Sequence, residues 1–260
     1  MQPTSEGVLS PAEQFDRIAF LYDDIMTGVP YDEWLAHVQR ILAKYSYTPQ
    51  TVLDLCCGTG TFSRLLAENG YEVSGSDISA EMIRIAKERS ARAGLDIDFR
   101  VQDAARLRLG KKFDLVVSLF DSLNYILEAS SLQQAFHGVA QHLNPGGMFI
   151  FDMNTELAFL AGLFDQNNLL NKHARVRYNW RSSYDKAARI CRVQMDFTYK
   201  SANADEMVEV VHYQRAYDQT EITDMLATAG LTTRAVYNAY TLRRPTKHSD
   251  RVFYVATREK

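Results

Sequence analysis

The segment TVLDLCCGTGTFS, residues 51–63, decides the fold of this chain. Its apolar run Val52 to Leu55 predicts a buried strand, which Gly58 and Gly60 end at a sharp turn. Apolar residues at helical spacing follow at once, from Phe62. A strand, a glycine turn and a helix are typical of the opening of a nucleotide-binding α/β unit, because glycine lets the backbone turn and approach a ligand closely. An ordinary βα turn is the alternative for this segment taken alone.

Acidic residues stand at the ends of three successive predicted strands. Asp54 ends the first, and Asp77 follows it by 23 positions, close to the spacing of about 20 residues at which a carboxylate binds a ribose hydroxyl pair. The alternative is that Asp77 only caps the next helix, although Ser79 already supplies a cap there. Asp103, after the third strand, fits an adenine contact and a surface loop equally well.

The composition bounds the class of protein. The chain has 260 residues, 46% hydrophobic and 23% charged, which suits one large α/β domain. A formal net charge of -3 gives no general attraction to nucleic acid or anionic membranes, and no apolar run approaches the roughly 20 residues of a membrane span. Cys56, Cys57 and Cys191 form neither a disulfide framework nor a zinc pattern, which predicts a reducing, cytoplasmic setting without a metal site. Residues 1–10 are polar and predict a flexible tail without a signal sequence.

Strands and helices alternate along most of the chain. This rhythm predicts a Rossmann-like, doubly wound, mostly parallel sheet of seven strands, with residues 51–169 and 218–260 as its core. The predicted strands are residues 52–55, 71–76, 97–101, 113–119, 148–151, 231–240 and 251–256, the last two antiparallel at the edge. A tight turn is predicted at residues 144–147.

Residues 11–50 predict a helical cap of two helices, separated at residues 28–30. Tyr22, Tyr31 and Trp34 lie near this break. They either cover the edge of the sheet or close over a ligand at the glycine turn that follows.

Residues 170–217 break the alternation and predict an antiparallel β insert after the fifth core strand, which serves as a lid or pocket wall or as a dimerisation element. We expect the face bearing Tyr178 and Trp180 to turn toward the pocket. Residues 172–192 are basic, with Asp185 their one acid, and a solvated face is favoured over an anion site for a carboxylate or phosphate. His212 is expected to be a packed or surface histidine.

Taken together, the motifs resemble those of the class I S-adenosylmethionine-dependent methyltransferases. They are DLCCGTG (residues 54–60), Asp77, Asp103-Ala104, the strand 113–119 and LNPGG (residues 143–147). Three further segments look like small-molecule members, including glycine N-methyltransferase and the amino-sugar N,N-dimethyltransferases: Tyr22-Asp23, residues 31–34 and DSLNY (residues 121–125).

The resemblance implies S-adenosylmethionine as cofactor and assigns its contacts. Gly58, Thr59 and Gly60 would pass under its methionine and ribose, with Asp54 at the amino group, Tyr22 near the carboxylate, Trp34 closing over the ligand and Leu119 under the sulfonium. Asp77 would hold the ribose, Ile78 and Met82 would lie against the adenine, and Asp103 and Ala104 would meet its edge.

Two departures from the family pattern matter. Cys56 stands where many relatives have glycine, a change that we expect to be tolerated. Residues 119–122 lack the Asn/Asp-Pro-Pro-aromatic motif of enzymes that methylate bases or glutamine amides, which argues against those substrates.

The implied function is methyl transfer to a small-molecule acceptor, by N- or O-methylation. Asp121 or Tyr125 would take or relay the proton of an amine acceptor. Three alternatives remain: a non-catalytic adenosylmethionine-binding or regulatory protein, an RNA methyltransferase that uses the basic hairpin, and an NAD-binding oxidoreductase. The last would have a third glycine where this chain has Ser63. We expect neither a membrane nor a nucleic-acid partner, and the insert is compatible with a homodimer.

Overall fold

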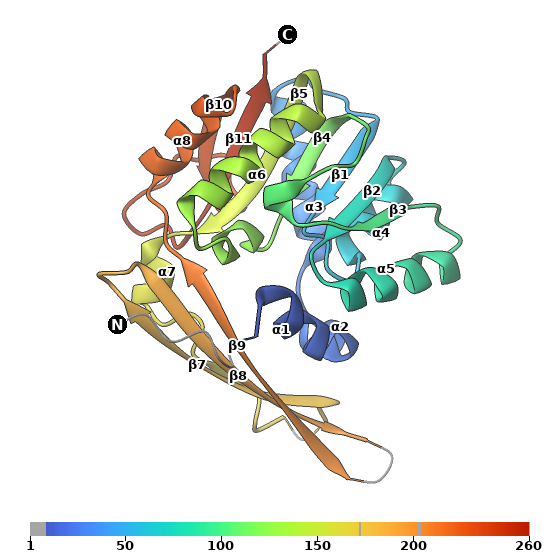
Figure 1. Ribbon diagram of the computed structural model, residues 1–260, viewed down its shortest axis with the longest axis vertical. Helices are drawn as coiled ribbons and strands as arrows, with labels where there is room; N and C mark the ends of the chain where they lie inside the picture. The colour runs from blue at the N-terminus through green and yellow to red at the C-terminus, as the bar shows by residue number, and fades with distance from the viewer. Residues whose placement is uncertain (1–8, 172, 202–203, 260) are drawn as a thin grey trace.

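The computed structural model describes residues 9–171, 173–201 and 204–259, so most of the predicted tail lies outside the described residues. A seven-stranded sheet has the order β10-β11-β5-β4-β1-β2-β3 (Figure 1). Its strands are β1 Thr51–Leu55, β2 Glu72–Asp77, β3 Asp98–Val101, β4 Phe113–Ser118, β5 Leu143–Asn154, β10 Leu231–Asn238 and β11 Arg251–Arg258. The strands β1 to β5 pair in parallel, and β11 is antiparallel to β5 and β10. The predicted Rossmann-like fold is confirmed.

Helices cover both faces of this sheet, as a doubly wound fold requires. Three pack on one face: α3 Tyr31–Lys44, α4 Thr61–Glu68 and α5 Ala80–Arg92. Two pack on the other: α6 Ala129–His142 and α8 Gln219–Thr228. The caps follow the sequence, since the Ser79 hydroxyl accepts the Met82 N–H at the start of α5.

The strand order reverses between β1 and β4, which are parallel neighbours although β2 and β3 intervene in the chain. In open α/β sheets the crevice outside the carboxyl ends of strands at such a point binds ligands. Here that crevice is bordered by the glycine turn after β1 and by the short helix η3 Ser122–Tyr125 after β4.

The predicted turn at residues 144–147 lies inside β5. Phe113 pairs with Leu143 and Leu115 pairs with Met148, so β5 has extra residues relative to β4 and forms a bulge there. A Cβ on Gly147 would lie 2.8 Å from the carbonyl oxygen of Asn144, which explains the need for glycine at this bulge.

The helical cap differs from the two predicted helices. Its first part is divided into α1 Pro11–Ile18, the short helix η1 Ala19–Leu21 and α2 Tyr22–Ile25. Asp16 of α1 accepts hydrogen bonds from the Ser79 hydroxyl (2.5 Å) and the Glu81 N–H (3.1 Å) at the start of α5. Tertiary contacts therefore set the direction of this segment, which lies between the core and the insert (Figure 1).

The insert is a four-stranded antiparallel sheet of β6 Gln166–Asn167, β7 Val176–Asp185, β8 Ile190–Lys200 and β9 Asp205–Arg215. It begins earlier than the boundary predicted at residue 170, because β6 pairs with Trp180 and Asn179 of β7. Helix α7 Glu156–Leu160 leads into it. Figure 1 shows the long hairpin of β8 and β9 running past α1 and away from the core.

Candidate active site

A cavity of about 940 Å³ lies at the carboxyl ends of the core strands and extends under the insert. Four parts of the chain line it. The cap contributes Phe15 and Tyr22, the core strand ends contribute Asp77 and Asp121, and the insert contributes Tyr178, Trp180 and His212. Tyr240 and Arg251, from the last part of the chain, complete the wall. The predicted orientation of Tyr178 and Trp180 toward the pocket is confirmed.

The glycine turn is shaped for close approach. Gly58 and Gly60 have φ of 54° and 73°, and a Cβ on Gly60 would lie 2.8 Å from the Phe99 ring. Gly60 thus supports the turn from behind and lies outside the lining of the cavity. Cys56 also has a positive φ, 64°. Because that conformation favours glycine, the departure noted at Cys56 carries local strain.

Asp77 holds the glycine turn in place. Its two carboxylate oxygens accept the backbone N–H groups of Gly58 and Ser79, each at 2.9 Å. Burial raises the pKa of this carboxyl group, while the backbone hydrogen bonds lower it. Ser79, and not Asp77, caps α5, so the helix-capping alternative for Asp77 is wrong. Asp77 is buried and is one of the residues that line the cavity.

A side chamber of about 50 Å³ lies beside Asp54 and shares lining residues with the cavity, including Tyr22 and Gly58. Its walls include Tyr22, Tyr31, Trp34 and Leu119. Asp54 accepts a 2.5 Å hydrogen bond from the Ser63 hydroxyl, and burial raises the pKa of Asp54 to about 7. Thr59 also borders this chamber, but its hydroxyl donates to Asp23 at 2.5 Å and so joins the turn to α2.

The four predicted adenine contacts all border the cavity. They are Ile78, Met82, Asp103 and Ala104. Ile78 is exposed and Met82 is buried. One oxygen of Asp103 accepts the Ala105 N–H at 2.9 Å, and Asp103 caps the short helix η2 Ala104–Arg106. Asp103 therefore lies in a loop and also lines the cavity.

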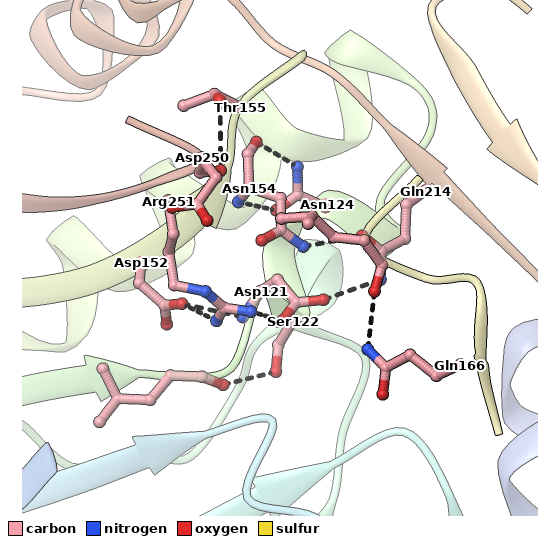
Figure 2. A network of polar contacts seen from close by, with 12 residues as sticks. Asp121, Ser122, Asn124, Asp152, Asn154, Thr155, Gln166, Gln214, Asp250 and Arg251 are labelled. Carbon is pink, nitrogen blue, oxygen red and sulfur yellow. Dashed lines mark hydrogen bonds and ion pairs between the residues drawn. The ribbon is translucent and has the colours of Figure 1, made fainter. Parts of the chain in front are cut away.

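Asp121 lies at the centre of a buried polar network (Figure 2). Its oxygens accept hydrogen bonds from Arg251 and from the Gln214 side chain, both at 2.7 Å, and its backbone N–H donates to Asp152. Arg251 also pairs with Asp152. Phe120 and Asp121 have φ of 66° and 50°, so this network holds a strained turn at the end of β4.

Tyr125, His212 and Phe15 form a group of three mutually packed rings that line the cavity. The ring centroids of His212 lie 4.7 Å from Phe15 and 5.5 Å from Tyr125. Burial raises the pKa of Tyr125 and lowers that of His212 to about 4, so both are neutral at pH 7. The sequence prediction for His212 missed its position on the cavity wall. Its alternation with Val210 and Gln214, which are also buried, is the signal that was available.

The chain is similar to known methyltransferases over nearly its whole length. A family model described as a methyltransferase domain matches residues 52–147. A putative methyltransferase of Geobacillus sp. (strain WCH70) is 30% identical over 246 residues, which are 93% of this chain and 98% of that protein. A solved S-adenosylmethionine-dependent methyltransferase from Clostridium acetobutylicum ATCC 824 aligns with a TM-score of 0.82 and 25% identity, over 95% of this chain and 99% of its own.

The chain belongs to the class I S-adenosylmethionine-dependent methyltransferases. This methyltransferase is also similar, over a shorter part of its length, to the dTDP-3-amino-3,6-dideoxy-alpha-D-glucopyranose N,N-dimethyltransferase of Streptomyces fradiae. That relative is 29% identical over 143 residues, which are 54% of each protein.

The side chamber of this methyltransferase combines a buried carboxyl group with aromatic walls. Among the described residues, no cation forms an ion pair with buried Asp54. A bound ammonium group would supply the missing charge, and aromatic walls favour a cation by about 0.5–2 kcal/mol per contact.

None of the helices in the described ranges is long and apolar enough to cross a membrane.

Proposed function

We propose that this methyltransferase transfers a methyl group from S-adenosylmethionine to a nitrogen or oxygen of a small molecule held in the same cavity. The observation that carries the proposal is the continuity of one cavity from the glycine turn to the aromatic face of the insert. The cofactor supplies an electrophilic methyl group, so the acceptor lone pair forms the new bond while the carbon–sulfur bond breaks with its electrons on sulfur.

Within this proposal, the cavity divides into a cofactor side and an acceptor side. Asp77 would bind the ribose hydroxyls, and Asp54 would bind the amino group, each as a charge-assisted hydrogen bond. The remaining cofactor contacts that we propose are Tyr22, Trp34, Gly58, Thr59, Ile78, Met82, Asp103, Ala104 and Leu119, with Gly60 shaping the turn. The acceptor would lie beneath Tyr178 and Trp180.

The proposed catalytic contribution is mainly positional. Well-oriented proximity is worth about 7–11 kcal/mol, so a dedicated base is not required. Both oxygens of Asp121 already accept hydrogen bonds, which favours a positioning role, through the turn at the end of β4, over a proton-accepting one. Tyr125 remains the proposed catalytic residue of the two, as a neutral hydroxyl beside the acceptor.

The charge pairing on the insert favours an acceptor that is not a nucleic acid. Three arginines of its basic hairpin already pair with carboxylates: Arg177 with Asp205, Arg181 with Asp196, and Arg189 with Asp218 and Glu221. Such paired arginines favour the solvated-face interpretation over a phosphate-binding surface. A homodimer remains a prediction, to be tested by light scattering.

Two measurements test the proposed function. Calorimetry should show binding of adenosylmethionine and adenosylhomocysteine, and none of NAD. A screen of small amines, phenols and carboxylates with labelled cofactor should then give a methylated product. Binding of NAD, or cofactor binding without transfer to any acceptor, would contradict the proposal.

A further inference from the structure

The acceptor side of the cavity is built mainly from rings and apolar chains. Phe15 of α1 faces a wall of the insert that includes Tyr178, Trp180, Met195 and Phe197. The rings of Tyr178 and Trp180 lie 5.2 Å apart, and that of Trp180 meets Phe197 edge-on at 6.3 Å. Surfaces of this kind bind flat apolar groups through stacking and area burial.

Among the residues that the structure describes, the lining offers no unpaired lysine or arginine to an anionic group on the acceptor. Of the described residues that line the cavity, Arg251 is the one lysine or arginine, and Asp121 and Asp152 both pair with it. The lining also contains Asp77, Asp103 and Asp250. A phosphate or carboxylate on the acceptor would therefore lose its hydration without gaining a cation, which is strongly unfavourable.

Within the described part of the chain, two buried polar atoms on this side have no partner: Nε1 of Trp180, which is a donor, and Nε2 of His212. His212 has an exposed fraction of 3%, and within the described part of the chain its Nε2 forms no hydrogen bond. The ring is held edge-on between Phe15 and Tyr125 and borders the cavity. Buried polar groups are normally satisfied, so an orphan at a cavity wall indicates a ligand that completes it.

We propose that the acceptor is an uncharged, ring-bearing apolar molecule and that His212 accepts the hydrogen bond of its nucleophilic N–H or O–H. The proposal rests on the proposed methyl transfer and names the class of its acceptor. It differs from what the name of the Streptomyces fradiae relative implies, since a dTDP-linked sugar carries a diphosphate.

The neutral state of His212 suits this task. A neutral imidazole has one unprotonated nitrogen, which accepts a hydrogen bond. In an imidazolium both nitrogens are protonated, so it cannot accept one, and its charge would repel a sulfonium. Holding the acceptor N–H or O–H at one point orients its lone pair, which then forms the bond to the methyl carbon while the carbon–sulfur electrons pass to sulfur. The acceptor proton leaves to solvent after transfer.

The test uses three probes that share one ring system: 2-naphthol, 2-naphthyl phosphate and 2-methylnaphthalene. Each is titrated into the full-length protein saturated with adenosylhomocysteine. We expect 2-naphthol to bind at least about tenfold more tightly than the phosphate, because the anion lacks a partner. It should bind about 2- to 10-fold more tightly than 2-methylnaphthalene, the range of one net hydrogen bond.

The variant His212→Phe keeps a ring and removes the acceptor nitrogen, so it should abolish the preference for 2-naphthol over 2-methylnaphthalene. His137→Phe, at an exposed histidine of α6, is the matched control and should keep the preference. If His212→Phe does not bind adenosylhomocysteine, His212→Gln replaces it, and its side-chain oxygen should retain part of the preference.

Each outcome is decisive. Equal or tighter binding of 2-naphthyl phosphate overturns the acceptor class, and a His212→Phe protein that still prefers 2-naphthol overturns the role of His212. Failure of the wild-type protein to bind adenosylhomocysteine would instead contradict the proposed methyl transfer itself.

Discussion

The two sheets of this methyltransferase use their residues in opposite ways. The core strand β4 is buried along nearly its whole length, whereas in β8 of the insert fully buried residues alternate with partly buried ones. A strand covered on both faces can present polar chemistry only where it ends, so Asp54, Asp77 and Asp121 all lie at or just after strand ends. A strand buried on one face can place side chains along its length, as Tyr178 and Trp180 do.

This difference separates two tasks. The family model matches residues 52–147, all before the insert begins. Most of the cofactor contacts that we propose lie in the part of the chain that this model matches, and Tyr22 and Trp34 of the cap lie before it. The wall that we assign to the acceptor comes from the insert, which that model does not include.

The largest expected effect is at the junction of the two sheets. Arg251 of β11 has an exposed side-chain fraction of 17% and pairs with Asp121 and Asp152, while Gln214 of β9 also contacts Asp121. Replacing Arg251 with leucine leaves two buried carboxylates without a cation and should lower the free energy of unfolding by about 3–5 kcal/mol. Urea denaturation measures this loss.

The control is Arg234→Leu, at an exposed arginine of β10 that pairs with Glu259 at 3.6 Å. That pair should contribute less than about 1 kcal/mol. Equal losses in the two variants would show that the junction is no more than a surface ion pair.

Asp77→Ala sharpens the assignment of the core to the cofactor. The variant loses the carboxylate of a residue that lines the cavity, which also accepts the Gly58 N–H, so adenosylhomocysteine should bind about 1.5–3 kcal/mol more weakly. Calorimetry measures the change. Asp96→Ala, at an exposed aspartate before β3, should leave the affinity as it is. An unchanged affinity in Asp77→Ala would return this residue to a purely structural role.

Asp54→Asn tests the side chamber through pH. Because the folded pKa of Asp54 is raised to about 7, the folded state binds more protons than the unfolded state between about pH 4 and 7, and stability falls as the pH rises through that window. Without ligand, the wild-type protein should lose on the order of 2 kcal/mol of unfolding free energy through Asp54 between pH 5 and 8, and Asp54→Asn should not show this loss. Thermal melts at both pH values measure it. The same variant should bind adenosylhomocysteine more weakly. If it were more stable than the wild-type protein at pH 5 but not at pH 8, the raised pKa of Asp54 would be contradicted.

The smallest expected effect is at Cys56. Its φ of 64° is costly for a residue with a Cβ, so Cys56→Gly should stabilise the protein by roughly 0.5 kcal/mol once the extra freedom of glycine in the unfolded chain is deducted. Cys57→Gly is the control, because Cys57 is not among the residues with positive φ. It should destabilise the protein, and a similar loss at Cys56 would show that the turn is not strained.

Much of the core was predictable because its signals are local. The apolar run at residues 113–119, the glycines at 58 and 60 and the Ser79 cap act within a few positions of one another. Parallel strands then bring their carboxyl ends to one edge, which is why Asp77 and Asp103 could be expected near one ligand. The alternating insert was predictable for the same reason, since its period of two is visible within a single strand.

Sequence alone determined the class of fold, the glycine turn and the motifs that indicate adenosylmethionine as cofactor, because each depends on neighbours in the chain. Only the tertiary structure decided the state of the polar groups. Arg251 hydrogen-bonds Asp121 from 130 positions away, and this contact is the reason that we propose a positioning role for Asp121 in place of a proton-accepting one. His212 likewise gains its neutral imidazole and free nitrogen from burial beside Phe15 and Tyr125. Burial and ion pairing are properties of assembled surfaces, and no local pattern of residues specifies them.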